Sequence, residues 1–226
     1  MHRHLLTLAI ALLTCGAALR AQTCTTTWPY LYPDFQDGTV YMRGGGTQNI
    51  KLNIHLLRTS LHYIELGMIK EAFPRDIDSI RIGGDLFRYV NGVPMRVAAR
   101  GTAGYVAERL TADFAAALEG SGAYGMSAST ISKTDLSSLE VSGGTNQNHM
   151  LLLQSKDQGK TAEIEGEYFL VAGADVYPAV RKDVLEGVPE DRKESVATFI
   201  KRHKIKWKRP DSLVLLADFL AEEEQQ

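Results

Sequence analysis

Strict alternation between apolar and polar side chains constrains the fold of this chain more than any other feature. From Ile50 to Leu56, aliphatic residues occupy every second position, with Lys51, Asn53 and His55 between them. Successive side chains of a β-strand point to opposite faces of a sheet. This segment therefore predicts a strand with one buried face and one polar face.

The period of two continues through residues 38–119, which we expect to form an antiparallel β region. Asn91-Gly92 is the strongest hairpin signal, because both residues tolerate the positive φ of a type I′ turn. Pro94 has no backbone N–H to donate, so its strand is expected at a sheet edge. Residues 112–118 suit either a strand or a helix. The other predicted strands are 39–43, 61–66, 78–82, 86–90, 93–99 and 105–110.

Residues 120–147 are rich in Ser, Gly and Thr and predict a loop or linker. In residues 148–226, two buried strands, 150–153 and 168–172, are expected before the chain turns helical. Helices are predicted over 178–185, 189–204 and 213–222, the last capped by Asp211 or Ser212. The fold class is therefore α+β, an antiparallel β-sheet or small open barrel followed by C-terminal helices. Residues 148–226 either pack on the β region or form a domain of their own.

The first 21 residues have the three-part layout of a secretory signal peptide. A short basic head precedes an apolar run over residues 5–13, and Ala21 is the expected cleavage point. The run is too short to span a membrane, and no later segment has the length and apolar character of a span. We therefore expect export to the periplasm or cell surface. The alternative is a lipoprotein anchored through Cys15, which lies just after the apolar run.

Residues 22–37 form a lead-in in which proline adjoins aromatic residues, at Trp28-Pro29-Tyr30 and Tyr32-Pro33. Proline disfavours both helix and central strand, so we expect an irregular segment. Its aromatic side chains are expected either to cover a sheet face or to form an exposed patch. Cys24 would be the single cysteine left after cleavage, and it is either a free thiol or bridged to another chain.

Short motifs are spread along most of the chain: Gly38-Thr39-Val40-Tyr41, Lys51-Leu52-Asn53, Gly122-Ala123-Tyr124-Gly125, Val176-Tyr177-Pro178-Ala179, and the run from Phe199 to Ile205. Together they resemble a class of uncharacterised exported proteins of Gram-negative bacteria. That class has no known activity. The resemblance therefore implies export and carries over no catalytic residue and no cofactor.

Two histidines in neighbouring predicted strands give the sharpest chemical hypothesis. A two-residue loop at Arg58-Thr59, or a four-residue loop over 57–60, would place His55 directly opposite His62, about 5 Å apart at Cβ. Imidazoles at that spacing can share a transition metal ion, although no third ligand lies beside them in the sequence. A three-residue loop would break the pairing. The alternatives are a metal site and an ordinary pair of solvated strand histidines.

Six cations fall within nine residues near the C-terminus, with no acid among them: Lys201, Arg202, Lys204, Lys206, Lys208 and Arg209. If they share one face, they suit an anionic surface such as lipid, lipopolysaccharide phosphate or acidic glycan. The alternative is a solvated helix end, where cations interact favourably with the helix dipole. Nucleic acid is the least expected partner, because the exported compartment holds little of it.

No arrangement of residues indicates a particular reaction. The serines of residues 121–142 lack the Gly-x-Ser-x-Gly context of a hydrolase, and the glycine runs lack the lysine of a phosphate loop. We therefore expect no cofactor and interpret the chain as an exported, non-enzymatic envelope protein or binding module for a protein or glycan. The alternatives are a metal-dependent enzyme or metal-binding protein that uses His55 and His62, and anionic-surface binding through residues 201–209.

Overall fold

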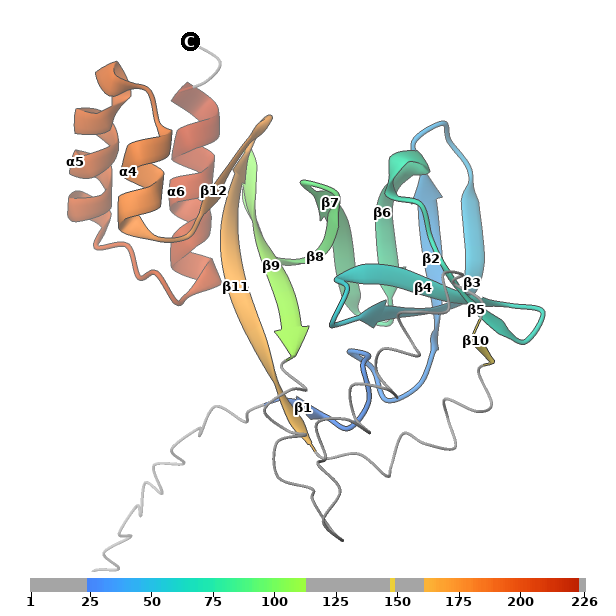
Figure 1. The fold of residues 1–226 in the computed structure, drawn as a ribbon. Coiled ribbons are helices and arrows are strands. Elements are labelled where there is room, and N and C mark those ends of the chain that lie inside the picture. The colour runs from blue at the N-terminus through green and yellow to red at the C-terminus, as the bar shows by residue number, and fades with distance from the viewer. Residues whose placement is uncertain (1–23, 113–146, 149–160, 224–226) are drawn as a thin grey trace, which may run out of the picture.

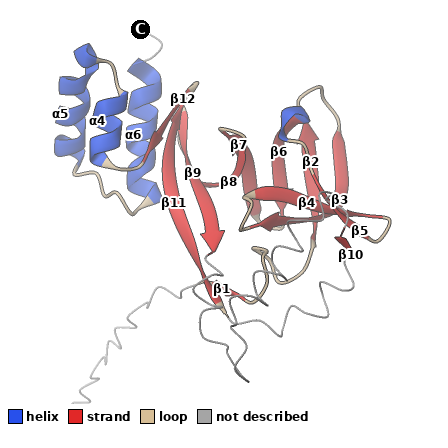
Figure 2. Cartoon of the chain, in the orientation of Figure 1, coloured by secondary structure: helices blue, strands red, loops and turns tan. Residues whose placement is uncertain are grey.

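The computed structural model describes residues 24–112, 147–148 and 161–223. In chain order the described strands are β1 (Thr25–Thr26), β2 (Gln36–Met42), β3 (Thr47–His55), β4 (Ser60–Glu65), β5 (Met68–Glu71), β6 (Ile77–Ile82), β7 (Asp85–Val90), β8 (Val93–Arg100), β9 (Gly104–Ala112), β10 (Gln147–Asn148), β11 (Ala162–Ala172) and β12 (Asp175–Pro178). The described helices are α4 (Arg181–Gly187), α5 (Lys193–His203) and α6 (Pro210–Glu223), with 3₁₀ turns η1 (Pro74–Asp76) and η2 (Glu190–Arg192). The protein is thus β-rich α+β, with strands followed by C-terminal helices, as predicted (Figure 2).

The described strands form one antiparallel sheet that curls into an open half-barrel (Figure 1). Their order is β1-β11-β9-β8-β7-β6-β2-β3-β4-β5-β10, and β12 also pairs with β11. Most neighbours in the sheet are neighbours in the sequence, because short turns connect them. The pairing of β2 with β6 joins the β2–β5 meander to the β6–β9 meander. The pairing of β11 with β9 brings residues 162–178 into the same sheet.

The hairpin between β7 and β8 has the predicted turn. Asn91 and Gly92 have φ values of 51° and 79°, both in the left-handed region that a type I′ turn requires. The prediction of an edge strand at Pro94 is wrong, because β8 lies between β7 and β9. The ladder with β9 begins only at Arg96, so the missing N–H of Pro94 removes no hydrogen bond from it. β5 and β12 were not predicted.

Several predicted features lie outside the described residues. They are the signal segment 1–21 with Cys15, residues 113–118, the loop 120–146 and the strand 150–153.

Apolar side chains on the inner face of the half-barrel form one core. Leu52 and Ile54 of β3 are fully buried there, as the alternation predicts, and Phe87 of β7 packs with them. Burying a side chain of this size contributes about 1.5–3 kcal/mol. The remaining members are Val40, Leu61, Ile77, Ile80 and Ile82.

The helices pack on the end of the sheet formed by β9, β11 and β12 (Figure 1). The predicted buried stripe of the last helix is confirmed, since Leu216, Ala217 and Leu220 are all buried. The helix predicted over 178–185 is α4, which begins at Arg181, later than predicted, because Pro178 still belongs to β12.

A single carboxylate fixes α6 to the turn between β8 and β9. Asp218 accepts hydrogen bonds from the backbone N–H groups of Thr102, Ala103 and Gly104, at 3.1, 2.9 and 2.8 Å. Burial opposes ionisation of this carboxyl, but the three donors outweigh it and hold the pKa of Asp218 below its ordinary value. A Cβ on Gly104 would lie 2.6 Å from the carbonyl oxygen of Ala217, so this close approach requires glycine.

The lead-in covers part of the outer face of the sheet. Trp28, Tyr30 and Phe35 are all buried there, which confirms the first of the two predicted alternatives. The segment is held by backbone hydrogen bonds: Leu31 N–H donates to Ile54, and Leu56 N–H donates to Pro29. This cover determines the environment of the two predicted site histidines.

Candidate functional site

The structure brings His55 and His62 together, but not by the predicted pairing. His62 pairs with Asn53, and His55 pairs with Ser60, so the two histidines are diagonal neighbours on the outer face. The turn spans residues 56–59 rather than 57–60, which shifts the register. The shift occurs because Leu56 leaves the ladder: its N–H donates to Pro29, and its side chain packs beside Leu110 and Ala162.

The two imidazole rings are stacked and buried rather than solvated. Their centroids are 4.8 Å apart with an interplanar angle of 26°, and the residues are only 7% and 9% exposed. The ring of Tyr30 stands edge-on to both, at 5.1 Å from His55 and 5.5 Å from His62. The polar face of the alternating segment is therefore covered where the two histidines lie.

Hydrogen bonds engage the Nδ1 atom of each ring. The backbone N–H of Arg58 donates to Nδ1 of His55 at 3.2 Å, which places the proton of the neutral ring on Nε2. The hydroxyl of Tyr30 and Nδ1 of His62 are hydrogen-bonded at 2.9 Å. Nε2 of His62 lies 3.6 Å from Oε2 of Glu71 and has no hydrogen-bond partner in the part of the chain that is described.

Burial is the main reason that the pair is neutral. Loss of hydration, with further contributions from the neighbouring His62 and Arg58, lowers the pKa of His55 to about 3. Burial likewise lowers the pKa of His62 to about 4, with Arg58 as the second cause. Burial, followed by the charge of Glu71, raises the pKa of Tyr30 well above its ordinary value. The cluster therefore consists of uncharged rings at neutral pH.

Across residues 24–112, 147–148 and 161–223, no three His, Cys, Asp or Glu side chains are grouped so that they could hold a metal ion. The metal site at His55 and His62 therefore remains a prediction with two ligands. A shift of Tm on addition of zinc that disappears on replacement of both histidines by alanine is its test.

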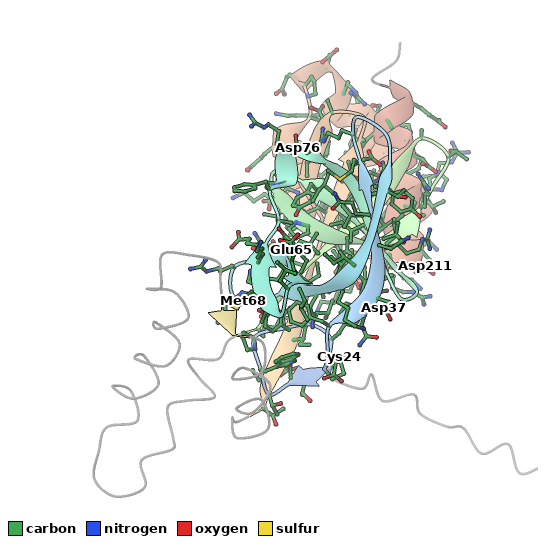
Figure 3. The ribbon with its side chains drawn as sticks, turned by 90° about the vertical axis from the view of Figure 1, so that its right-hand side faces the viewer. Cys24, Asp37, Glu65, Met68, Asp76 and Asp211 are labelled. Atoms are coloured by element: carbon green, nitrogen blue, oxygen red, sulfur yellow. The ribbon has the colours of Figure 1, made fainter. Side chains whose placement is uncertain are left out.

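The same outer face continues beyond the lead-in as an exposed polar strip, which we define as Asp37, Thr39, Asn49 and Lys51. Asp37 pairs across the strands with Lys51, and Thr39 with Asn49. Nζ of Lys51 lies 3.1 Å from Oδ1 of Asp37, and the Thr39 hydroxyl donates to Oδ1 of Asn49 at 2.7 Å. Figure 3 looks onto this side of the molecule, with Asp37 labelled on the blue strands.

An open pocket of about 570 Å³ lies over the polar strip. Besides the four strip residues it is lined by Gly38, Ile50 and Ile64. It thus places a carboxylate, an ammonium group, an amide and a hydroxyl beside apolar lining.

The six predicted cations lie at the end of α5 and in the turn that leads to α6. All are exposed. Among them, Arg209 forms an ion pair with Asp211 at 2.8 Å. Lys201 and Arg202 occupy the last turn of α5, where positive charge is favourable beside the helix C-terminus.

No protein-family model, curated protein or solved structure matches this chain. Within the part of the chain that the structure describes, none of the helices has the length and apolar character needed to span a bilayer. Cys24 is an exposed free thiol.

The sequence did not indicate that Tyr30 and Glu71 lie beside the two histidines. Tyr30 belongs to a segment without regular structure, and Glu71 belongs to β5, a strand of only four residues. The signal available for Tyr30 was its place in an aromatic, proline-containing lead-in. No signal pointed to Glu71, because its neighbour β4 was predicted without a partner on that side.

Proposed function

We propose that this protein is an exported, non-enzymatic binding module that holds a glycan on the polar strip of its sheet. The observation that carries the proposal is the open pocket over Asp37, Thr39, Asn49 and Lys51. These four side chains provide both donors and acceptors, which is what the hydroxyl groups of a sugar require.

The strip contributes little to the stability of the fold. The side chains of Asp37 and Lys51 are 91% and 53% exposed, and an ion pair at such a site is worth about 0–1 kcal/mol. Their alignment across two strands is therefore available for recognition. A folded protein partner is less well suited, since protein interfaces use apolar and aromatic anchors, and the pocket lining contains no aromatic residue; of its two isoleucines, Ile50 packs with the inner core and leaves Ile64.

The buried histidine pair favours binding over catalysis. Tyr30 packs edge-on against both rings, Trp28 and Phe35 pack on Tyr30 in turn, and the two imidazoles are neutral across the physiological range. A general acid or base must reach the proton that it transfers. The cluster is better explained as the packing that fixes the lead-in beside the pocket.

The test is glycan binding by matched variants. Purified protein is incubated with insoluble peptidoglycan and with soluble polysaccharides, and bound protein is measured over a range of concentrations. The double variant D37A/K51A should bind about tenfold more weakly, because a charged hydrogen-bonding group is lost on each strand. The control K182A/E186A removes an exposed ion pair from α4 with the same charge change and should bind normally.

Equal binding by the two double variants would refute the assignment to the strip. If the unaltered protein binds none of these glycans but retains a defined envelope protein through the strip residues, the partner is a protein instead. Export is tested separately by the intact mass of the protein recovered from cells. This one measurement shows whether the chain is cleaved after Ala21, whether Cys15 carries lipid, and whether Cys24 carries an adduct.

A further inference from the structure

The connection between α5 and α6 carries a dense group of positive charges that the proposed glycan site does not use. We call it the basic turn and define it as Lys201, Arg202, Lys204, Lys206, Lys208 and Arg209. Figure 1 places this connection at the end of the helical layer away from the labelled C-terminus. Whether such a run can act as a surface depends on whether its charges point the same way.

The packing of two residues turns the lysines of this segment outward. Ile205 is 8% exposed and Trp207 is half-buried, and both pack into the core of the helical layer. Lys206, between these two residues, and Lys204 and Lys208, on either side of them, are exposed. Ile205 and Trp207 therefore anchor the turn to the helical core, and the three lysines lie on its solvent-exposed side.

Lys201 and Arg202 extend this charged surface along α5. The buried residues of α5 are Val196 and Ile200. At 100° per residue, Lys201 and Arg202 fall on either side of the line opposite that buried stripe. Both are exposed at the helix end that leads directly into the basic turn.

The backbone of the turn is fixed. Lys204 ends α5 in the left-handed conformation, with φ 49° and ψ 50°, and its N–H is directed to the carbonyls of Ile200 and Lys201. The N–H of Lys206 donates to the hydroxyl of Ser212 at 2.9 Å. A charged surface with a fixed backbone needs less ordering on binding than a loop without such bonds.

Most of this charge is not neutralised within the fold. Asp211, labelled in Figure 3, pairs with Arg209. Arg202 shares an open pocket with the acidic residues Asp191 and Glu194. None of the four lysines forms an ion pair with any carboxylate in the described part of the chain.

We propose that the basic turn is a docking surface for membranes rich in anionic phospholipid. Lysine suits such a partner, because its ammonium is a point charge on a flexible stem that follows diffuse negative charge rather than one fixed geometry. Each basic residue close to an anionic bilayer strengthens binding by up to about fivefold. Single-stranded nucleic acid is a poorer fit, since it requires aromatic rings open to stacking. Trp207 is packed against the helical core, and one face of the His203 ring is stacked on Phe199.

The test is partition of the full chain onto vesicles of phosphatidylcholine alone and of phosphatidylcholine with 30% phosphatidylglycerol. Any contribution of the apolar run 5–13 is common to both vesicles, so the readout is the ratio between them. We expect at least a tenfold preference for the anionic vesicles at 50 mM NaCl and its loss at 500 mM NaCl.

Charge reversal locates the surface. K204E/K206E should reduce binding to anionic vesicles about 25-fold. K206E/K208E leaves the left-handed position at Lys204 unchanged and should have a similar effect, so a folding defect in the first variant does not decide the result. The control K182E/K193E makes the same change of net charge elsewhere on the helical layer and should bind within about threefold of the unaltered protein.

Normal binding by both turn variants would overturn the proposal, as would equal binding to the two vesicle types. Binding to an oligonucleotide without binding to anionic vesicles would also overturn it and would identify a nucleic acid as the partner. None of these outcomes bears on the polar strip, so the two proposals stand or fall separately.

Discussion

Acidification from pH 7.5 to pH 5 should destabilise this protein through the buried His55–His62 pair. In the folded state their pKa values are about 3 and about 4. In the unfolded chain both histidines titrate near the ordinary value of about 6.5. As the pH falls through 6.5, the unfolded state therefore binds two protons that the native state does not bind.

The sign follows from proton linkage. Stability decreases with falling pH wherever the unfolded state holds more protons, and it is fully present only above the unfolded pKa. The slope approaches about 2.7 kcal/mol per pH unit when both groups are protonated only in the unfolded state. Integrated from pH 7.5 to pH 5, the loss is about 4 kcal/mol. That is a large fraction of the 5–15 kcal/mol that is typical of a folded domain.

Urea denaturation at a series of pH values measures this loss. Tryptophan fluorescence is a suitable probe, because Trp28 packs in the same cluster as Tyr30 and is 3% exposed. Far-ultraviolet circular dichroism follows the whole fold in parallel. Coincident transitions by the two probes show that a single free energy of unfolding applies.

The non-titrating variant H55N/H62N isolates the pair. Asparagine replaces the hydrogen-bonding group at the Nδ1 position, which is the atom used by both rings. We expect this variant to lose less than about 1 kcal/mol between pH 7.5 and pH 5. The control H203N changes an exposed histidine on α5 and should retain the full loss. An equal loss of stability in the double variant and the unaltered protein would contradict this role of the histidine pair, as would equal stability of the unaltered protein at both pH values.

Three further predictions concern stability at neutral pH. D218A should lower the free energy of unfolding by about 1–3 kcal/mol, measured in urea, because it leaves three backbone donors of the β8–β9 turn without their acceptor; no change would contradict this role. L66N should raise Tm, with a gain of about 1 kcal/mol, because Leu66 is 96% exposed and adopts φ 51° before Gly67, where asparagine is preferred. F87A should cost about 3–5 kcal/mol, because Phe87 is 1% exposed in the core of the half-barrel; a cost below 1 kcal/mol would show that this core is not packed as described.

Local patterns in the sequence predicted the parts of this fold that depend on local physics. The alternation around Leu52 identified β3 and its buried face, since side-chain direction in a strand depends only on position. Asn91-Gly92 fixed its own turn through the backbone preferences of the two residues. The turn at Leu66-Gly67 escaped prediction, because leucine rarely adopts positive φ and so gives no turn signal.

Features that depend on contacts between distant segments could not be predicted from local patterns in the sequence. The pattern correctly put His55 on the face opposite Leu52, yet that face is buried, because a lead-in more than twenty residues upstream covers it. The register between β3 and β4 depends in the same way on a hydrogen bond from Leu56 to Pro29. The hydrogen bonds between Asp218 and a turn more than a hundred residues away correspond to no pattern in the sequence.

The two proposed surfaces can act independently because they lie on different parts of the molecule. The lead-in covers the outer face at His55 and His62, and the polar strip on β2 and β3 is an exposed part of the same side of the half-barrel. The basic turn belongs to the helical layer, which packs against the other end of the sheet (Figure 1). A membrane bound to the basic turn would therefore leave the strip open to solvent. Saturating glycan should accordingly leave the partition onto anionic vesicles unchanged, whereas competition between the two ligands would mean that they share one surface.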